Sequence, residues 1–143
     1  MLTIEKVIIL KSVNIFAKLT EERLAEIASI LTEVEFRPGE EIIRKGDVGD
    51  SMYIIIDGKV RIHDEGRTLA TLGERDILGE IALLDHQPRS ASANAGDEEV
   101  RALRLEHDAF YELMSDHIEV VTGVLQVLCE RIRKLMILTS AKS

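Results

Sequence analysis

The sequence predicts an α+β domain built on an antiparallel β-roll of the jelly-roll type, with about eight strands and with helices at both ends. Two observations lead to this prediction. The middle of the chain alternates short runs rich in β-branched residues with turn sequences that contain glycine. The two ends instead repeat apolar residues every three or four positions, which is the period of a helix. At 143 residues we expect one domain, with N-terminal helices over 1–33, the roll over 34–105 and C-terminal helices over 106–139.

Two helices are predicted before the roll. The first covers roughly residues 4–12. The second begins after Thr20, whose hydroxyl can cap a helix and which is followed by two glutamates that favour the positive first turn. It is expected to end near Glu33, where the apolar residues of one helical face stop. The residues of that face are Leu24, Ile27, Ala28 and Leu31.

The strands of the roll are predicted from the runs that lie between turns. Turn sequences occur at 38–39, 46–50, 57–58, 65–66 and 96–97. Strand-like runs occupy 34–37, 41–44, 52–56, 59–63, 68–72, 89–95 and 100–105. Many short strands, closed by turns that contain glycine, are typical of an antiparallel barrel or jelly roll.

Two helices are predicted after the roll, over residues 107–115 and about 118–138. The longer helix carries an apolar stripe whose members are spaced by three and four residues, as in a heptad repeat. Either this stripe packs onto the roll, or it leaves the roll to associate with another helix or to act as a lid. Its members are Ile118, Val121, Leu125, Leu128, Ile132 and Leu135.

Composition limits the functions that this chain can have. Apolar residues make up 45% and charged residues 31%, as in ordinary globular proteins. The apolar stretches are far too short to cross a bilayer, and no secretion leader is recognisable. The single cysteine, Cys129, excludes an internal disulfide framework and is expected to be a small buried group on a helix. A cytoplasmic location is therefore expected.

The charge of the chain argues against a nucleic-acid partner. The formal net charge is −8, whereas a nucleic-acid surface normally shows as a basic patch. The basic cluster of Arg131, Arg133 and Lys134 lies near the end of a predicted helix, where cations complement the helix dipole. A phosphate site in so acidic a chain must therefore act through local geometry rather than through the overall field.

The segment between residues 79 and 93 carries the residues with the most specific chemistry. The run GEIALL at 79–84 is followed by PRSASA at 88–93. A short helical turn after Gly79 would direct the free N–H groups of residues 81–83 at an anion. Glycine at position 79 allows the backbone to approach a ligand closely.

Arg89 and Glu80 are expected to hold different parts of one ligand. Arg89 supplies a planar cation for two phosphate oxygens, and the Ser90 hydroxyl and the Ala91 N–H are further donors. Phosphate would repel Glu80, so the expected partner of this carboxylate is a ribose 2′-hydroxyl. A cyclic nucleotide offers both groups in one rigid molecule. The alternative is that Glu80 and Arg89 pair with each other or lie in solvent on a loop.

These residues resemble the cyclic nucleotide-binding domain family, which includes regulatory subunits of cAMP-dependent protein kinase, catabolite activator proteins and cyclic-nucleotide-gated channels. The family's phosphate-binding cassette is matched by residues 79–92 without an insertion. An upstream signature is matched by Gly46, by residues 49–54 and by residues 58–60. The resemblance covers nearly the whole chain and implies a regulatory, non-catalytic sensor whose C-terminal helices reposition on binding.

The resemblance implies roles for individual residues. Glu80 would hold the ribose 2′-hydroxyl and Arg89 the cyclic phosphate. Leu83 would couple the cassette to a hinge helix around Phe110, and the closing helix would act as a lid. The pocket would be completed by Gly79, Ile81, Ala82, Ser90 and Ala91.

Ligand preference and base recognition are also inferred from the resemblance. Leu78 precedes Gly79 where an aromatic residue is common in the family. Ser90 stands where a small residue usually accompanies cAMP preference and threonine cGMP preference; serine occurs there in catabolite activator proteins, which favours cAMP over cGMP. Arg133 and Met136 on the last helix are the candidates for capping the base.

Other function classes find less support. A metal-dependent enzyme on a β-roll needs clustered histidines and a carboxylate, and the four histidines are scattered, so no enzyme, metal or cofactor is expected. They are His63, His86, His107 and His117. Because few residues follow Leu138, we do not expect a DNA-binding helix-turn-helix in this chain.

One alternative function is kept, namely a degenerate member of the family that acts as an interaction module without ligand. The expected partners are a cyclic nucleotide and either a second copy, bound through the C-terminal helix, or an attached effector domain. Neither nucleic acid binding nor membrane insertion by this chain is expected.

Overall fold

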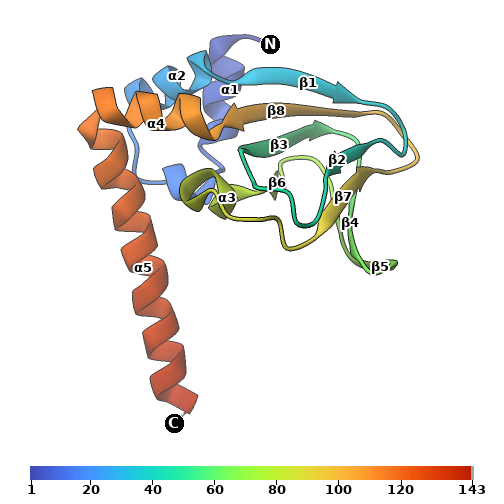
Figure 1. Ribbon diagram of the computed structural model, residues 1–143. Coiled ribbons are helices and arrows are strands. Elements are labelled where there is room, and N and C mark those ends of the chain that lie inside the picture. Colours follow the sequence, from blue (N-terminus) through green and yellow to red (C-terminus); the bar gives the residue numbers. More distant parts are fainter. Residues whose placement is uncertain (143) are drawn as a thin grey trace. The chain divides into compact units, whose positions relative to one another are not determined.

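The computed structural model describes the backbone of residues 1–142 and the side chains of residues 1–140 (Figure 1). Two compact units are distinguished by their internal contacts. The helical unit consists of Met1–Ser29 together with the chain from Glu112 onward, and the roll unit consists of Ile30–Tyr111.

The roll unit contains two four-stranded antiparallel sheets, as the sequence predicts (Figure 1). The strand order is β1-β8-β3-β6 in one sheet and β2-β7-β4-β5 in the other. Between β6 and β7 lies the short helix α3 (Glu80–Asp85), and after β8 the chain enters α4 (His107–Asp116). The strands are β1 (Thr32–Phe36), β2 (Glu41–Ile43), β3 (Ser51–Asp57), β4 (Val60–Asp64), β5 (Arg67–Leu72), β6 (Ile77–Leu78), β7 (Ser92–Ala95) and β8 (Val100–Glu106).

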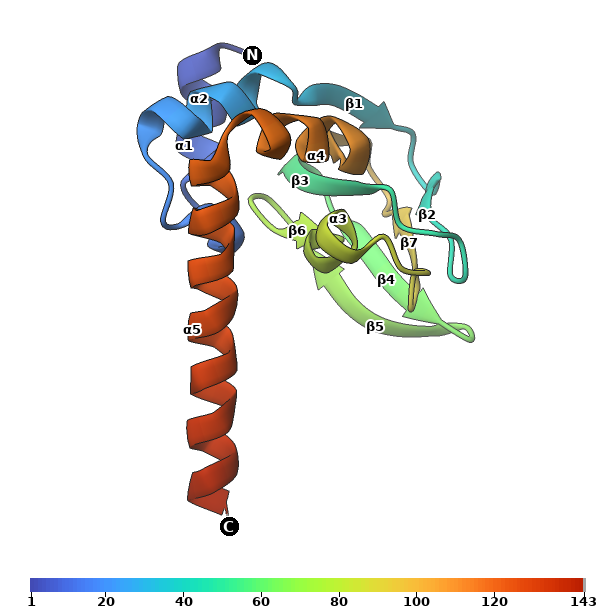
Figure 2. The same cartoon turned by 60° about the vertical axis from the view of Figure 1, so that its left-hand side comes forward.

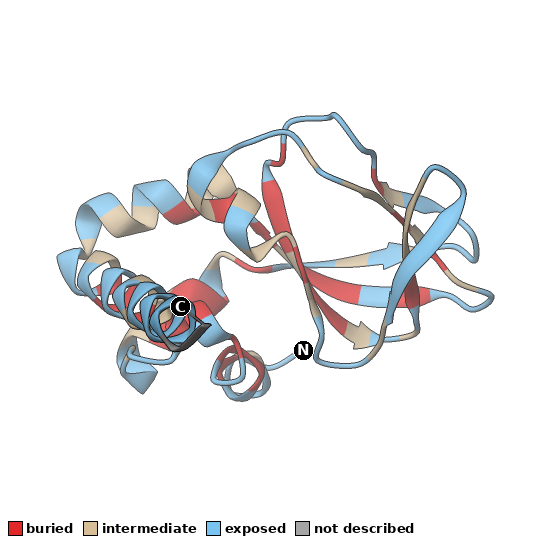
Figure 3. Ribbon diagram, turned by 90° about the horizontal axis from the view of Figure 1, so that it is seen from below, coloured by how far each residue is buried: buried red, intermediate tan, exposed pale blue. Residues whose placement is uncertain are grey.

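Strands β3 and β8 at the centre of the first sheet supply much of the core of the roll (Figure 3). The cross-strand pairs Met52–Leu105 and Ile54–Leu103 bury all four side chains completely. Alternating residues of a strand point to one face, so these four side chains form a continuous apolar surface on one face of the sheet. Ile55, which points to the opposite face of β3, is also completely buried and packs with Val60 and Ala93 of the second sheet. Strand β3 is therefore buried on both faces.

Two strands differ from their predicted positions. The strand β6 is not expected from the sequence; its two residues pair with Tyr53 and Ile54 of β3, and so short a run shows no period. Strand β7 begins at Ser92, later than expected. The reason is that residues 87–89 bond to the loop 46–49 rather than to a strand of the sheet.

Helix α2 (Glu21–Ser29) of the helical unit begins as predicted. The Thr20 hydroxyl accepts a hydrogen bond from the Arg23 N–H at 3.3 Å, which confirms the cap. The predicted end near Glu33 is wrong, because β1 starts at Thr32 and pairs with β8. Strand pairing of this β-branched segment thus outweighs its apolar helical spacing. The unit also contains α1 (Thr3–Leu10), a 3₁₀ turn η1 (Asn14–Phe16) and α5 (Ile118–Lys142).

Helix α5 buries a different face from the one that the heptad stripe marks. Its buried residues are Val120, Gly123, Val124 and Val127. Gly123 lies directly against Leu19, since a Cβ at this glycine would come within 2.5 Å of the leucine Cδ2. Small side chains therefore let the helix approach its neighbour closely.

The predicted stripe itself is mostly exposed, so the interpretation of the stripe as a packing face is wrong. Ile118, Leu125, Ile132 and Leu135 are each more than half exposed. Figure 2 shows that the second half of α5 extends past the other helices of the helical unit.

Cys129 on the same helix is exposed, which corrects the prediction that it is buried. Over residues 1–142, no helix is long and apolar enough to cross a membrane.

Candidate functional site

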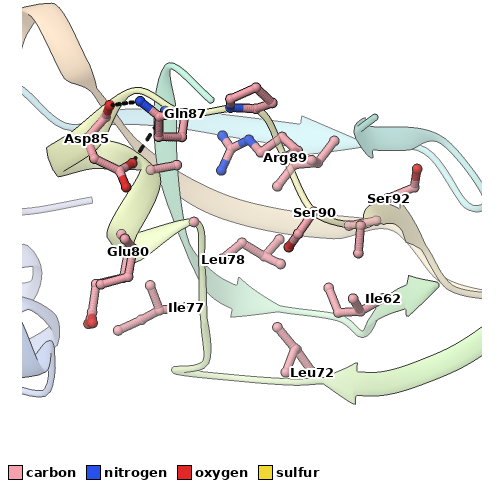
Figure 4. A pocket seen from close by; sticks show the side chains of 17 residues that line it. Ile62, Leu72, Ile77, Leu78, Glu80, Asp85, Gln87, Arg89, Ser90 and Ser92 are labelled. Carbon is pink, nitrogen blue, oxygen red and sulfur yellow. Dashed lines mark hydrogen bonds between the residues drawn. The ribbon is translucent and has the colours of Figure 1, made fainter. Parts of the chain in front are cut away.

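A cavity of about 440 Å³ in the roll unit is lined by both halves of the segment 79–93 (Figure 4). The first half lies at the start of α3, and the second half lies in the loop before β7 and in β7 itself. The remaining wall comes from strands β2, β4, β5 and β6 and contains only aliphatic side chains. We call it the aliphatic wall, and it consists of Ile43, Ile62, Leu72, Ile77 and Leu78.

The start of α3 is shaped by Gly79. This residue precedes the helix with φ of 76° and ψ of 28°, a left-handed conformation that glycine adopts without strain. The N–H of Leu83 bonds to the Gly79 carbonyl, so the helical ladder begins here. The N–H groups at the first positions of a helix have no acceptor within it, and those of Ile81 and Ala82 lie at this end. The Ile81 side chain is half exposed, so this residue can serve a ligand only through its backbone.

Arg89 lies between two glycines. Its Nη2 donates a hydrogen bond to the Ser51 carbonyl at 2.5 Å. A Cβ at Gly49 would come within 3.0 Å of Arg89 Nε, and a Cβ at Gly79 would collide with Arg89 Nη1. The guanidinium thus fills a slot that exists only because neither neighbour has a side chain.

The backbone of Arg89 is held by the loop that precedes β3. The Arg89 N–H donates to the Asp47 carbonyl at 2.7 Å, and the Gly46 N–H donates to the Arg89 carbonyl at 2.9 Å. The Gly49 N–H bonds to the Gln87 carbonyl at 2.9 Å. Sequence reasoning identified this loop as a turn but not as the support of Arg89; its two glycines, spaced three apart, were the available signal.

Burial lowers the pKa of the Arg89 guanidinium from its ordinary value, and electrostatic attraction to Tyr53 and Asp50 opposes this shift. Arginine nevertheless stays charged at any physiological pH. Among the described residues it makes no ion pair, so the alternative in which Glu80 neutralises Arg89 does not hold. A half-buried cation held by a neutral carbonyl is well suited to receive an anion.

The other predicted ligand residues lie around the same cavity. Glu80 and Ala82 are half-buried at the start of α3, and Ser90 and Ala91 follow Arg89 along the loop (Figure 4). The structure therefore brings together all of the predicted pocket residues. It adds the aliphatic wall, in which Ile77 and Leu78 directly precede Gly79, whereas Ile43, Ile62 and Leu72 come from other strands and were not identified by sequence reasoning.

The predicted relay and base-capping residues belong to different units. Leu83 on α3 and Phe110 on α4 are completely buried side chains of the roll unit. Arg133 and Met136 lie on α5 in the helical unit and are exposed. Their predicted role in capping a base remains a prediction.

The histidines do not form a metal site. Within the part of the chain that the structure describes, no group of three or more histidine, cysteine or acidic side chains could hold a metal ion. His63 pairs with Asn94 on the second sheet at 2.6 Å. His117 lies in the helical unit, where its Nδ1 is 3.0 Å from Nη1 of Arg23. His86 and His107 lie together in the roll unit, with ring centroids 4.4 Å apart.

Comparisons with known proteins agree with this geometry. The family model described as "Cyclic nucleotide-binding domain" matches residues 33–117. The chain is 34% identical over 131 residues to the CRP-like cAMP-activated global transcriptional regulator of Mycobacterium tuberculosis (strain ATCC 25618 / H37Rv), over 88% of this chain and 58% of that protein. It is 41% identical over 86 residues to the cGMP-dependent protein kinase of Toxoplasma gondii, over 60% of this chain and 9% of the kinase.

Solved structures show the same fold. The crystal structure of the N-terminal domain of a transcriptional regulator from Streptomyces coelicolor A3(2) superposes with a TM-score of 0.84 at 31% identity. That match covers 92% of this chain and 94% of the other. The chain thus spans a whole domain of this regulator but little more than half of the Mycobacterium protein.

Proposed function

The chain belongs to the cyclic nucleotide-binding domain family, and from this premise we propose that its pocket binds a cyclic nucleotide, with cAMP as the preferred ligand. The observation that carries the proposal is the burial of the Arg89 guanidinium and its hydrogen-bond partner. Its guanidinium is half-buried at the edge of a cavity of about 440 Å³ and is held by the Ser51 carbonyl rather than by a carboxylate. A phosphodiester would supply the negative charge that this cation lacks.

Each part of a cyclic nucleotide has a matching surface in the pocket. The cyclic phosphate would lie between Arg89 and the first N–H groups of α3, with the Ser90 hydroxyl beside it. The ribose 2′-hydroxyl would donate to Glu80. The nucleobase would lie along the aliphatic wall, whose side chains offer contact area but no hydrogen bonds.

Two lines of support favour cAMP over cGMP. The Mycobacterium relative, matched over 88% of this chain, is described as cAMP-activated. The residue after Arg89 is serine rather than threonine, and serine is found there in catabolite activator proteins. The Toxoplasma kinase is described as cGMP-dependent and makes cGMP the competing ligand.

Calorimetric titration with cAMP, cGMP and AMP tests the proposal. We expect saturable binding of cAMP, with weaker binding of cGMP and none of AMP. Arg89→Ala should lose on the order of 2–5 kcal/mol of binding free energy, because the phosphate would stay buried without a cation. This loss corresponds to an affinity about 30-fold to several thousand-fold lower. The exposed Arg101 of β8 provides a matched control, and Arg101→Ala should bind as the wild type does.

The opposite result would be equally clear. If protein freed of co-purified nucleotide binds none of the three, the domain is an interaction module without ligand. If cGMP binds more tightly than cAMP, the proposed preference is wrong while the site stands.

We also propose that binding shifts the position of the C-terminal helices. Leu83 follows the anion-binding end of α3 and is completely buried, so a contraction of the cassette would displace core atoms. A ligand can shift such an equilibrium only through its different affinities for the two states. Hydrogen exchange along α4 and α5, measured with and without cAMP, should differ; identical protection in both states would exclude the shift.

A second copy of the chain is the partner that we propose for the exposed stripe of α5. Ile118, Leu125, Ile132 and Leu135 repeat at heptad spacing and lie in solvent, which is the pattern of a two-helix seam. Sedimentation velocity should therefore show a dimer, and Ile132→Glu with Leu135→Glu should give a monomer. If the wild type is monomeric at high concentration, the stripe serves an attached effector domain instead.

The domain is proposed to act as a sensor without catalytic activity in the cytoplasm. The family model that matches describes a binding domain, and one of its relatives is described as a transcriptional regulator.

A further inference from the structure

Three aromatic rings of the roll unit form a stack between α3 and α4. The rings of His107 and Tyr111 are stacked with centroids 4.1 Å apart and an interplanar angle of 26°. The ring of His86, at the end of α3, lies 4.4 Å from that of His107 at a tilt of 49°. We call His86, His107 and Tyr111 the ring stack. These three side chains do not line the pocket, and no pattern in the sequence links them.

The ring stack is connected to the anion-binding helix by hydrogen bonds. The Tyr111 hydroxyl donates to the carbonyl of Leu84 in the last turn of α3. In the middle of the stack, the backbone N–H of His107 donates to the Asp50 carbonyl at 2.7 Å, just before β3. The stack therefore fixes the end of α3 relative to the first turn of α4 and to the strand that carries Ser51, the acceptor of Arg89.

His86 holds its place in a conformation that is unfavourable for a non-glycine residue. Its φ is 53° and its ψ is 40°, the left-handed region, which is strained for a residue with a Cβ. The neighbouring turn is held by Gln87, whose N–H and side-chain amide both bond to Asp85. Such a conformation persists only while its surroundings hold it, so the end of α3 depends on the ring contact.

Two imidazoles in contact repel each other when both carry a positive charge. Histidine is the side chain that changes charge between about pH 8 and pH 5. The Oδ1 of Asp108 lies 3.0 Å from Nδ1 of His107, and the ring of Tyr111 stacks on that of His107. The ring centroid of His86 lies 4.4 Å from that of His107, so two charged rings would be in direct contact.

The charged groups near the stack are mostly acidic. Asp85 adjoins His86 in sequence, Glu106 and Asp108 flank His107, and Asp50 supplies the carbonyl that His107 contacts. The nearby cation Arg104 pairs with Glu106 at 3.2 Å. Acidification brings histidine side chains toward the charged state, in which the contact between the two rings is repulsive.

We propose that the ring stack is a pH-dependent positioning device for α3, which holds the phosphate-binding helix in place while at least one imidazole is neutral and releases it when both are charged. This inference rests on the proposed function, because α3 carries the anion-binding N–H groups. Release lowers the population of the binding-competent pocket, and apparent affinity falls in proportion to that population. His86, His107 and Tyr111 are positioning residues that do not touch the ligand.

The test is calorimetric titration with cAMP, and in parallel with cGMP, at about pH 7.5 and about pH 5.5, a range in which the phosphodiester keeps its charge. The wild type should bind about five- to tenfold more weakly at the lower pH, because the charged rings repel each other and fewer molecules then hold α3 in its binding-competent position. His107→Phe keeps a stacked ring without charge, so its nucleotide affinity should differ by less than about twofold between the two pH values.

Three further variants separate the roles of the residues. His86→Asn, in which asparagine tolerates the left-handed backbone, should also lose the pH dependence. Tyr111→Phe keeps the ring but loses the bond to Leu84, so its affinity should fall about threefold at both pH values while the pH dependence remains. His63→Gln, at a histidine that bonds to Asn94 outside the ring stack, should behave as the wild type does.

The outcomes separate this inference from the proposed function. If the wild type binds equally well at both pH values, or if His107→Phe and His86→Asn keep the full pH dependence, the positioning role is refuted and the nucleotide site stands. If neither nucleotide binds at about pH 7.5, the proposed function fails, and this inference fails with it. Should His107→Phe not fold, the exposed His86 still provides the decisive variant.

Discussion

The roll and helix α5 use apolar residues in opposite ways. In the roll, the large aliphatic side chains of Ile54 and Ile55 in β3 and of Leu103 and Leu105 in β8 are completely buried, and the exposed positions of the two strands carry charged residues. In α5 the large side chains of Leu125, Ile132 and Leu135 are exposed, whereas the buried face is made of valines and a glycine. Residue size therefore predicts burial in one region and misleads in the other.

The difference has a physical cause. Strand β3 at the centre of the first sheet is buried on both faces, since the consecutive residues Ile54 and Ile55 point to opposite faces and both are completely buried, so any large apolar side chain there is enclosed. A long helix can carry apolar residues on two faces, and only its neighbours decide which face packs. Close approach selects small residues such as Gly123, which lies against Leu19, and the larger residues remain on the free face.

The largest effect is expected in the roll, from Leu83→Ala. The Leu83 side chain is completely buried beneath the cassette, and truncating such a leucine costs about 2–5 kcal/mol of unfolding free energy. Urea denaturation measures this loss directly. Leu83 does not line the cavity, so nucleotide affinity should fall by the smaller factor. The change in hydrogen exchange along α5 that the ligand causes should be reduced more strongly.

Ile81→Ala is the matched control on the same helix. Its side chain is half exposed, so the unfolding free energy should change by less than about 0.5 kcal/mol. Equal losses in the two variants would show that α3 does not bury one defined face.

The next effect in size is expected for Gly79→Ala. An added Cβ would collide with the Arg89 guanidinium, and the left-handed φ of 76° adds strain of roughly 1–2 kcal/mol. Unfolding free energy and nucleotide affinity should therefore both fall. Gly66→Ala carries nearly the same φ, 78°, in open space. It should show the strain alone and no loss of affinity; a similar affinity loss in both variants would mean that contact with Arg89 is not the cause.

Much of the roll was predictable from local pattern, because turns with glycine and runs of β-branched residues specify short strands independently of the rest of the chain. What was missed depends on contacts between distant segments. The two residues of β6 become a strand only by pairing with β3, and residues 30–33 leave their helical pattern only by pairing of β1 with β8.

The candidate site likewise contains some residues that were predictable from local sequence and others that were not. Gly79, Glu80 and Arg89 were predictable because their chemistry is specific to phosphate and ribose, and they lie within one segment. The support of Arg89 by Gly46 and Asp47 was not, since it joins segments about forty residues apart through backbone atoms that any sequence carries. The contributions of Ile43 and Ile62 to the aliphatic wall were missed because they depend on how the second sheet folds over the cassette.

A pair of neighbouring residues in α5 tests the comparison directly. Val124 is 4% exposed and Leu125 is 54% exposed. Val124→Ala should therefore cost about 1–2.5 kcal/mol of unfolding free energy, whereas the larger truncation Leu125→Ala should change the stability of the monomer by less than about 0.5 kcal/mol. The measurement is made at low protein concentration, because self-association would add a contribution from Leu125. A larger cost at Leu125 in a demonstrated monomer would reverse the assignment of the buried face.

The smallest effect is expected at the ion pair that joins Lys18 to Glu130 of α5, with Nζ and Oε1 2.9 Å apart. A hydrogen bond and electrostatic attraction from Lys18 lower the pKa of Glu130 below its ordinary value. A carboxylate whose pKa is lowered by folding stabilises the folded state above its unfolded pKa, and this contribution disappears as the pH falls through the folded value.

Both side chains are largely exposed, so the contribution should also be screened by salt. Glu130→Gln should therefore lower the melting temperature slightly at neutral pH and low salt, and the difference should vanish at acidic pH or in about 1 M salt. A difference that persists in high salt would mean that Glu130 acts through packing. In that case the α5 contact would resemble the roll, where shape rather than surface charge supplies the stability.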